Sequence, residues 1–271
     1  MFNIFDYFIN NTSSNDDKND NNEITINDIK EAQDNIKKYC YRTPLIEVSD
    51  NINTKFYIKC ENMQRGGAFK IRGAINMLEK LSIKEKEAGV VTFSSGNHGL
   101  SLALASSLMD IKTCVVVMPT NAPTIKKDCV LKYGGEVQQV GTTTLERKQR
   151  AESEMKERGL TMIPPFDHYH IMCGQGTIGL EIIEDCPLNK KLVVYVPCSG
   201  GGLIGGISFA IKSIRKDAVI IGVEPITGIL IFHINITYQI IILLIIIYSP
   251  KNDKIFRCRF SYYLIICKWN C

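Results

Sequence analysis

A lysine in apolar surroundings is the first residue of this 271-residue chain that is equipped for covalent chemistry. Lys70 lies between Phe69 and Ile71, and Gly66-Gly67 precede it, so it enters a predicted helix beside apolar surface. Such surroundings disfavour the ammonium form, lower the lysine pKa and leave a neutral amine available for a Schiff base. Because most helical lysines are simply solvated, the neighbours of Lys70 are what distinguish it.

Four polar side chains gather in the turn Thr92-Phe-Ser-Ser-Gly-Asn-His-Gly-Leu100, between a predicted strand and a predicted helix. Hydroxyl, amide and imidazole groups around a helix start suit the binding of a carboxylate. Ser and Asn also cap helices routinely, but four such groups around one glycine exceed what a cap requires. The four residues are Ser94, Ser95, Asn97 and His98.

Three consecutive glycines follow the strand pattern in Val193-Val-Tyr-Val-Pro-Cys-Ser-Gly-Gly-Gly-Leu203. Glycines let backbone N–H groups converge on a ligand, and a helix N-terminus supplies positive potential, so an anion such as phosphate fits there. A tight strand-to-helix turn would use the same glycines, and this motif alone leaves both interpretations open. It is neither a Walker sequence nor a Gly-x-Gly-x-x-Gly dinucleotide loop.

These turns need strands that end where helices begin, and the hydrophobic pattern supplies them. Short apolar strands alternate with amphipathic helices, which predicts βαβ units and an α/β fold of two open, mostly parallel sheets flanked by helices. Predicted helices cover 27–39, 70–82, 97–109, 123–133, 144–158, 175–184 and 202–214, and predicted strands cover 56–60, 89–93, 113–118, 136–140, 192–196 and 218–223.

The same pattern predicts how the chain divides into domains. Residues 86–165 form a small domain, and residues 24–85 with 166–225 form a large domain that is incomplete as written. Residues 1–23 include a polar, acidic, low-complexity stretch that buries too little apolar area to fold, and we expect them to be disordered.

Taken together, the motifs resemble the fold-type II pyridoxal-phosphate enzymes, the tryptophan synthase β-like group, and within it the threonine/serine dehydratases and eukaryotic serine racemases. The resemblance covers about residues 26–225 and rests on six motifs in order. They are Phe69-Lys70-Ile-Arg-Gly-Ala, Ser94-Ser-Gly-Asn-His-Gly99, Met118-Pro-Thr-Asn-Ala-Pro-Thr-Ile-Lys126, Gly174-Gln-Gly-Thr177, Ser199-Gly-Gly-Gly-Leu203 and Gly222-Val-Glu-Pro225.

The resemblance implies a role for each candidate residue. Lys70 would hold pyridoxal 5'-phosphate as an internal aldimine, with Phe69 packed against the ring and Asn97 bonded to its 3-hydroxyl. The phosphate would lie in the turn formed by Ser199, Gly200, Gly201, Gly202 and Leu203. The substrate carboxylate would be bound by Ser94, Asn97 and His98, and Ser95 would serve the other face of the substrate.

The implied activity is conversion of L-serine or L-threonine to a 2-oxo acid and ammonia, racemisation of serine, or both. The cofactor acts as an electron sink, and Lys70 removes the α-proton. If Ser95 returns a proton from the other face, the product is the opposite enantiomer. Two alternatives remain open: a cysteine synthase-like β-replacement enzyme, and a catalytically inactive truncated fragment.

The divalent-cation site of racemase-like members is only half represented. Glu224 matches one carboxylate, but Leu230 stands where the resemblance calls for a second acidic ligand, so a magnesium site would lack half of its carboxylates. Family members also continue past this point with a region that residues 226–271 do not resemble. We therefore expect a C-terminally truncated family member.

The net charge of +4 marks the same boundary. Residues 1–225 carry 27 basic and 27 acidic side chains, whereas residues 226–271 carry five basic and one acidic. A neutral body excludes a nucleic-acid binder on charge grounds. The tail contains 23 uncharged residues, 226–248, of which 11 are Ile. That length could span a bilayer, but the segment is interrupted by polar residues and Ile favours strands.

We therefore interpret the tail as an aberrant apolar terminus, as translated intron or frameshifted sequence would give, rather than a membrane anchor or a genuine folded segment. None of the ten cysteines forms a Cys-x-x-Cys pair, and the start lacks the basic region of a signal peptide. These features predict a cytoplasmic protein with reduced thiols. The partners implied are a small amino-acid substrate and a second copy of the chain, as a homodimer.

Overall fold

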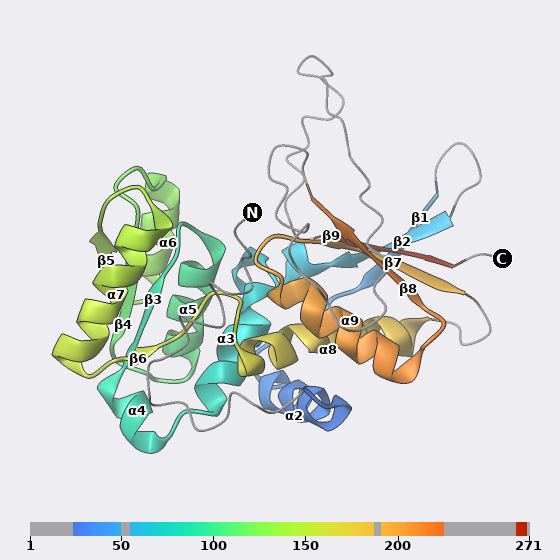
Figure 1. The fold of residues 1–271 in the computed structure, drawn as a ribbon, viewed down its shortest axis with the longest axis horizontal. Coiled ribbons are helices and arrows are strands. Elements are labelled where there is room, and N and C mark those ends of the chain that lie inside the picture. Colours follow the sequence, from blue (N-terminus) through green and yellow to red (C-terminus); the bar gives the residue numbers. More distant parts are fainter. Residues whose placement is uncertain (1–23, 50–54, 187–190, 225–263, 270–271) are drawn as a thin grey trace, which may run out of the picture.

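The structure is a computed structural model that describes residues 24–49, 55–186, 191–224 and 264–269 (Figure 1). Two lobes, each built on one sheet, meet at a central pair of helices (Figure 1). The predicted disorder of residues 1–23, the apolar stretch 226–248 and the position of Leu230 lie outside the described residues.

The smaller lobe contains a fully parallel four-stranded sheet in the order β5-β4-β3-β6, which confirms the predicted parallel pairing there. Both faces of the sheet are covered. Val116 and Met118 of β4 lie in the core beneath α5, and Val115 and Val117 pack toward α7. Burial on both faces explains the continuous apolar run of this strand. The elements are β3 (Val90–Phe93), β4 (Cys114–Met118), β5 (Glu136–Gln139), β6 (Thr161–Met162), α4 (Ile83–Ala88), α5 (Asn97–Leu108), α6 (Thr124–Lys132) and α7 (Thr144–Arg158).

The larger lobe contains a five-stranded mixed sheet in the order β1-β2-β9-β7-β8. Only β7 and β8 are parallel, whereas β9 is antiparallel to both of its neighbours. The expectation of mostly parallel strands therefore describes the smaller sheet better than this one. The elements are β1 (Leu45–Ser49), β2 (Lys55–Cys60), β7 (Leu192–Pro197), β8 (Val219–Val223), β9 (Leu264–Trp269) and the helices α2 (Ile26–Ile36) and α9 (Gly202–Ile214).

Strand β9 comes from the segment that the sequence assigned to an aberrant tail outside the fold. The structure inserts it between β2 and β7, where Ile265 is 1% exposed and belongs to the hydrophobic core. The physical reason lies in the strand's own sequence, Leu-Ile-Ile-Cys-Lys-Trp, because isoleucine and tryptophan favour the pleated, half-buried setting of a strand.

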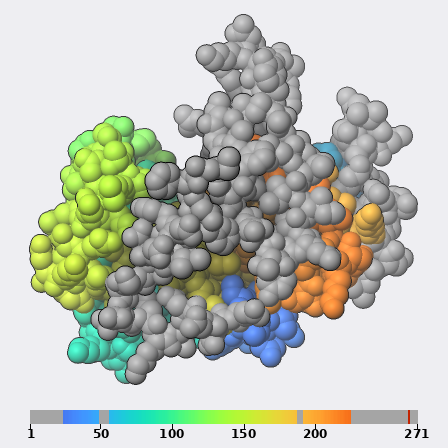
Figure 2. Space-filling view, viewed as in Figure 1, coloured from blue at the N-terminus to red at the C-terminus, as the bar shows by residue number. Residues whose placement is uncertain are grey.

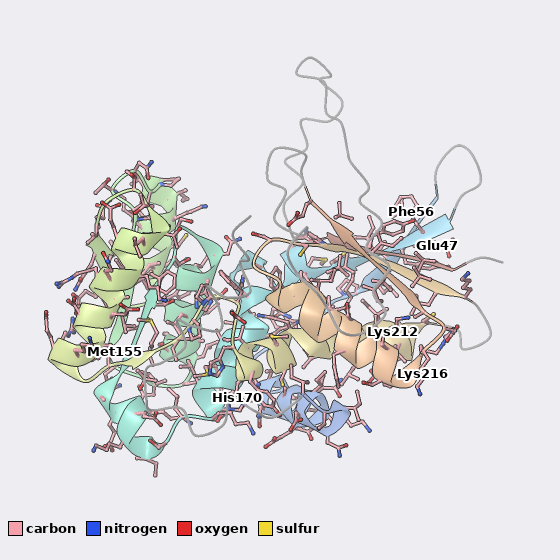
Figure 3. The ribbon with its side chains drawn as sticks, viewed as in Figure 1. Glu47, Phe56, Met155, His170, Lys212 and Lys216 are labelled. Carbon is pink, nitrogen blue, oxygen red and sulfur yellow. The ribbon has the colours of Figure 1, made fainter. Side chains whose placement is uncertain are left out.

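Two helices cross between the lobes with their backbones in contact. They are α3 (Lys70–Glu79) and α8 (Tyr169–Asp185). A Cβ on Gly174 would lie 2.6 Å from the Cα of Gly73, so only glycine fits at this crossing. Figure 3 labels Met155 on α7 in the smaller lobe, Lys212 at the far end of α9 in the larger lobe, and His170 at the start of α8 between them.

Most predicted elements are confirmed, and the differences are short or terminal. Helix α8 begins at Tyr169 instead of residue 175, because His168 caps it by accepting a bond from the backbone N–H of His170. The hydrophobic pattern predicted no element at β1, α4 or β6. Two short 3₁₀ helices, η1 (Glu61–Met63) and η2 (Arg65–Gly67), connect β2 to α3. Figure 2 shows α7 and α9 on opposite ends of the molecule.

Candidate active site

A cavity of about 430 Å³ lies where the two lobes face each other. The three turns singled out in the sequence all reach it: the start of α3, the β3–α5 turn and the β7–α9 turn. Residues far apart in the chain therefore form one site. Its lining includes Phe69, Lys70, Ser94, Ser95, Asn97, His98, Ser199, Gly200, Gly201, Gly202 and Leu203.

Lys70 is the first residue of α3, and its amine points into an apolar corner of the cavity. Its Nζ donates a hydrogen bond to the carbonyl oxygen of Pro165 at 2.6 Å. The same nitrogen lies 5.3 Å from the ring centroid of Phe69 and 5.9 Å from that of Phe166. Burial lowers the pKa of Lys70 to about 8, so a sizeable fraction of the amine is neutral near physiological pH.

The β3–α5 turn contributes polar groups to the lining of the same cavity. Ser94 Oγ accepts a bond from the N–H of Gly96 at 3.1 Å, which shapes the turn, and Asn97 begins α5. The hydroxyl of the exposed Ser95 and the amide of Asn97 have no hydrogen-bond partner within the described part of the chain. These two groups are therefore available to a ligand.

His98 is buried behind this turn in one defined tautomer. Its Nε2 lies 3.1 Å from the carbonyl oxygen of Ile163, which can only accept, so Nε2 carries the proton. Burial and the nearby charge of Lys70 lower the pKa of His98 to about 3, which leaves the ring neutral. Its Nδ1, without a partner among the described residues, is then an acceptor. A neutral ring in this state favours a ligand N–H or O–H over a carboxylate.

The β7–α9 turn brings the glycines against one aromatic residue. Gly201 precedes α9 with φ +86°, in the left-handed region that favours glycine. A Cβ on Gly202 would lie 2.5 Å from the backbone oxygen of Phe166, and one on Gly200 would lie 2.4 Å from its ring. Glycine at these two positions is what allows the turn to pack this closely against Phe166.

The start of α9 also leaves backbone donors available. No side chain caps this helix, and its first backbone bond runs from the N–H of Gly205 to the carbonyl of Gly201 at 2.8 Å. The N–H groups of Gly202, Leu203 and Ile204 precede that bond and have no partner within the helix. Converging N–H groups with the positive end of the helix dipole fit a phosphate.

Two cationic side chains that line the cavity, Lys126 and Arg147, were given no role from the sequence alone. Lys126 belongs to one of the six motifs, so its place could have been inferred. Arg147 carries no such signal: it is 7% exposed, with Nη1 bonded to the carbonyl of Thr142 and Nη2 to Oγ1 of Thr144, both at 3.0 Å. It forms no ion pair with any described residue.

Glu224 lies just beyond β8 and is 5% exposed. Burial raises the pKa of the Cys198 thiol to about 11, and the charge of the nearby Glu224 contributes to this rise. Among the described residues, no group of three or more His, Cys, Asp or Glu side chains is placed to hold a metal ion. A magnesium site at Glu224 therefore stays a prediction.

Two absences apply to the described residues. No helix there has the length and apolar character needed to cross a membrane. The cysteines resolved in this part of the chain are all free thiols.

In this α/β fold, a lysine of lowered pKa and a glycine-rich helix start line the same cavity. This arrangement suits an enzyme that binds a phosphorylated aldehyde cofactor, because the lysine can form a Schiff base and the helix start can hold the phosphate. The comparisons with known proteins define it further, because residues 36–236 match the family described as "Pyridoxal-phosphate dependent enzyme". The chain belongs to this family. The match continues past Pro225, where the resemblance seen in the sequence ends.

Three relatives illustrate the likeness. The chain is 42% identical to the serine racemase of Arabidopsis thaliana, covering 73% of this chain and 60% of the relative. It is 37% identical to the L-threo-3-hydroxyaspartate ammonia-lyase of Saccharomyces cerevisiae, covering 75% and 63%. The structure of threonine deaminase isoform 2 from Solanum lycopersicum matches with a TM-score of 0.68 at 40% identity, covering 74% and 55%. The chain thus spans about 60% of the length of the curated relatives that it matches.

Proposed function

We propose that this protein is a pyridoxal-phosphate-dependent ammonia-lyase of L-serine or L-threonine, a serine racemase, or both. The observation that carries the proposal is the position of Lys70, whose low-pKa amine shares one cavity with the glycine-rich start of α9 and with Ser95. The named activities of the relatives fit that arrangement.

The residues present fit the cofactor. The uncapped N–H groups at the start of α9, which line the cavity that contains Lys70, suit its phosphate. The ring of Phe69 lies beside the amine of Lys70, and the amide of Asn97 is available to a ring hydroxyl. When bound, pyridoxal 5'-phosphate supplies an electron sink that stabilises negative charge at the α-carbon of an amino acid.

Each side chain then has a defined task. With the cofactor bound, Lys70 Nζ would accept the α-proton, for which a pKa of about 8 is well matched. Ser95, which lines the same cavity, would offer a hydroxyl proton. A proton returned to the α-carbon by Ser95 would give the opposite enantiomer, whereas loss of the β-hydroxyl as water followed by hydrolysis would give a 2-oxo acid and ammonia. Ser94 and Asn97 orient the carboxylate.

The test is to incubate the full chain with pyridoxal phosphate and then with L-serine or L-threonine. We expect cofactor absorbance characteristic of a lysine Schiff base, 2-oxo acid from the substrate, and D-serine on chiral chromatography if racemisation occurs. Lys70→Ala should abolish all three, whereas Ser95→Ala should abolish D-serine and retain 2-oxo acid. Absence of the Schiff-base absorbance would favour the inactive fragment, and turnover of O-acetylserine with sulfide would favour a cysteine synthase-like enzyme.

A second substrate class is favoured by Arg147. A buried guanidinium without a described carboxylate partner, near Lys126 in the same cavity, suits the side-chain carboxylate of a β-hydroxy dicarboxylic amino acid. The yeast relative is named for such a substrate. We expect Arg147→Met to reduce turnover of L-threo-3-hydroxyaspartate at least about tenfold relative to L-serine. Equal loss with both substrates would assign Arg147 to structure instead.

We also propose that the protein is a cytoplasmic homodimer. The free thiols of the described residues support a reducing compartment. Dimerisation rests on the family resemblance, and light scattering of the purified chain would test it. Addition of magnesium to metal-free protein, with turnover as the readout, tests the half-matched cation site at Glu224: an increase would support the site, and an unchanged rate would agree with the missing second carboxylate.

A further inference from the structure

Four charged side chains are buried together behind the first turn of α3, on the side away from the cavity. They are Lys59 of β2, Glu61 of η1, Arg72 of α3 and Glu181 of α8, and none is more than 5% exposed. We refer to these four residues as the buried charge cluster. Two cations and two anions make the cluster neutral, so it need not be a binding site for an external ion.

Arg72 is the centre of the buried charge cluster. Its Nε and Nη2 donate to the two carboxylate oxygens of Glu61 at 2.9 and 2.8 Å. Its Nη1 and Nη2 donate to the two oxygens of Glu181 at 2.6 and 3.0 Å. A planar guanidinium held by two carboxylates in this way is fixed in both position and orientation.

The other members fix the carboxylates in turn. Lys59 Nζ lies 2.5 Å from Glu181 Oε2 and donates to the carbonyl of Thr43 at 2.6 Å, and Thr43 Oγ1 donates to Glu61 at 2.5 Å. Although burial alone would raise the pKa of Glu181, Arg72 and Lys59 hold it below its usual value. The cluster therefore ties three elements, β2, η1 and α8, to α3 through hydrogen bonds and ion pairs.

The position of Arg72 relative to Lys70 gives this cluster a use. Two residues along an α-helix correspond to a rotation of about 200°, so Arg72 projects from the face opposite Lys70. The glycines at the crossing of α3 and α8 permit close approach but supply no side chain to resist sliding. Phe69, at the cap position of α3, adds no capping bond.

We propose that Arg72 is a positioning residue that, through Glu61 and Glu181, sets the height and rotation of the first turn of α3 and so holds the amine of Lys70 in its apolar corner. Buried ion pairs are weak evidence for stability because desolvation offsets their attraction, but they do select one geometry over another. The inference concerns the placement of Lys70 and is independent of which substrate the protein takes.

The test measures Lys70 itself in the cofactor-free full chain. Acetylation of Lys70 by acetic anhydride, followed by peptide mass spectrometry across pH, gives a midpoint that reports its pKa. In the unmodified protein the midpoint should lie near 8. In Arg72→Lys, which keeps the charge but loses the planar fork, we expect it to rise by about one pH unit or more toward the usual value of roughly 10.4.

The matched control is Asn76→Ala, which breaks a different α3–α8 contact further along the helix. Asn76 is 1% exposed, and its Nδ2 donates to the carbonyl of His170 at 2.7 Å. A purely structural role for Arg72 predicts that both variants lower the melting temperature and that neither moves the Lys70 midpoint; that result would overturn the proposal.

A milder variant covers the case in which Arg72→Lys does not fold. Thr177→Val removes the Oγ1 that accepts from Arg72 Nη1 at 3.2 Å, together with the bond that this hydroxyl donates to the carbonyl of Gly174 at 2.7 Å, and it leaves all four charges in place. We expect a smaller rise of the midpoint in the same direction. An unchanged midpoint in this variant would also contradict the proposal, and neither result depends on turnover of any substrate.

Discussion

The amine of Lys70 is a base held where its charged form is penalised. Within the described part of the chain its Nζ donates one hydrogen bond, to Pro165, and the rings of Phe69 and Phe166 lie 5.3 and 5.9 Å away. No carboxylate forms an ion pair with it among the described residues. Burial of Lys70 therefore destabilises the folded protein while it lowers the pKa of the amine. Such perturbed pKa values are typical of functional sites.

The free-energy penalty of burying the charged amine of Lys70 predicts how the stability of the protein depends on pH. The pKa of Lys70 is about 8 when folded and roughly 10.4 when unfolded, so the buried charge destabilises the fold below pH 8. Between those values the unfolded chain holds a proton that the folded chain lacks, and stability rises with pH. Lys70→Met should stabilise the cofactor-free protein by up to about 3 kcal/mol at pH 7, less the lost bond to Pro165, and by little above pH 10.5.

Urea unfolding of both proteins at pH 7 and pH 10.8 measures this difference. Lys126→Met is the control, because that lysine lines the same cavity but is exposed, and it should change stability by less than about 0.5 kcal/mol. A Lys70→Met gain that persisted at the higher pH would show that packing rather than charge accounts for it.

His98 shows how one contact changes the role assigned to a residue. The sequence grouped it with Ser94 and Asn97 as a carboxylate ligand, on its proximity in the turn. The carbonyl of Ile163, 65 residues away, fixes the proton on Nε2 and leaves Nδ1 as an acceptor. No pattern within the motif could reveal that partner.

At the scale of elements, the start of α9 depends on the absence of side chains. Gly202→Ala would bring a Cβ within 2.5 Å of the backbone oxygen of Phe166, and a backbone atom cannot move aside cheaply. We expect the turn to shift and pyridoxal phosphate to bind at least about tenfold more weakly, because the N–H groups at the helix start would no longer converge. Equilibrium dialysis with the cofactor measures the change.

Gly205→Ala is the matched control on the same helix. Its Cβ would meet only the terminal methyl of Met172, at 2.8 Å, which a flexible side chain can withdraw. We expect cofactor affinity within about twofold of the unmodified protein. Equal weakening in both variants would indicate a general effect on α9 instead of a phosphate site at its start.

At the scale of the whole molecule, the sequence pattern predicted the features that depend on residues close together in the chain. The helices and strands with clear periodicity, such as 144–158, were predictable, and so were the three glycine-containing turns. The cavity residues Arg147 and Phe166 were not, because neither belongs to a recognised motif and both reach the site through tertiary packing. The mixed order of the larger sheet was also beyond prediction, since β9 and its neighbours are remote in sequence.

Strand β9 gives the larger lobe its continuity, and this can be tested directly. Without it, β2 and β7 would face each other across an unpaired gap. Its Ile265 is 1% exposed, belongs to the core and is the register partner of Lys59 in the buried charge cluster. We expect Ile265→Ala to lower the free energy of unfolding by about 3 kcal/mol, because a cavity would open beside that cluster.

Urea unfolding of Ile265→Ala, set against Ile83→Ala as a control, measures the effect. Ile83 is 77% exposed and should cost less than about 0.5 kcal/mol. If the two variants proved equally harmless, β9 would contribute nothing to the fold, and the expectation of a tail outside it would stand. A large loss at Ile265 alone would instead make the C-terminal segment part of the scaffold that holds Lys59, Glu181 and Arg72, and through them Lys70.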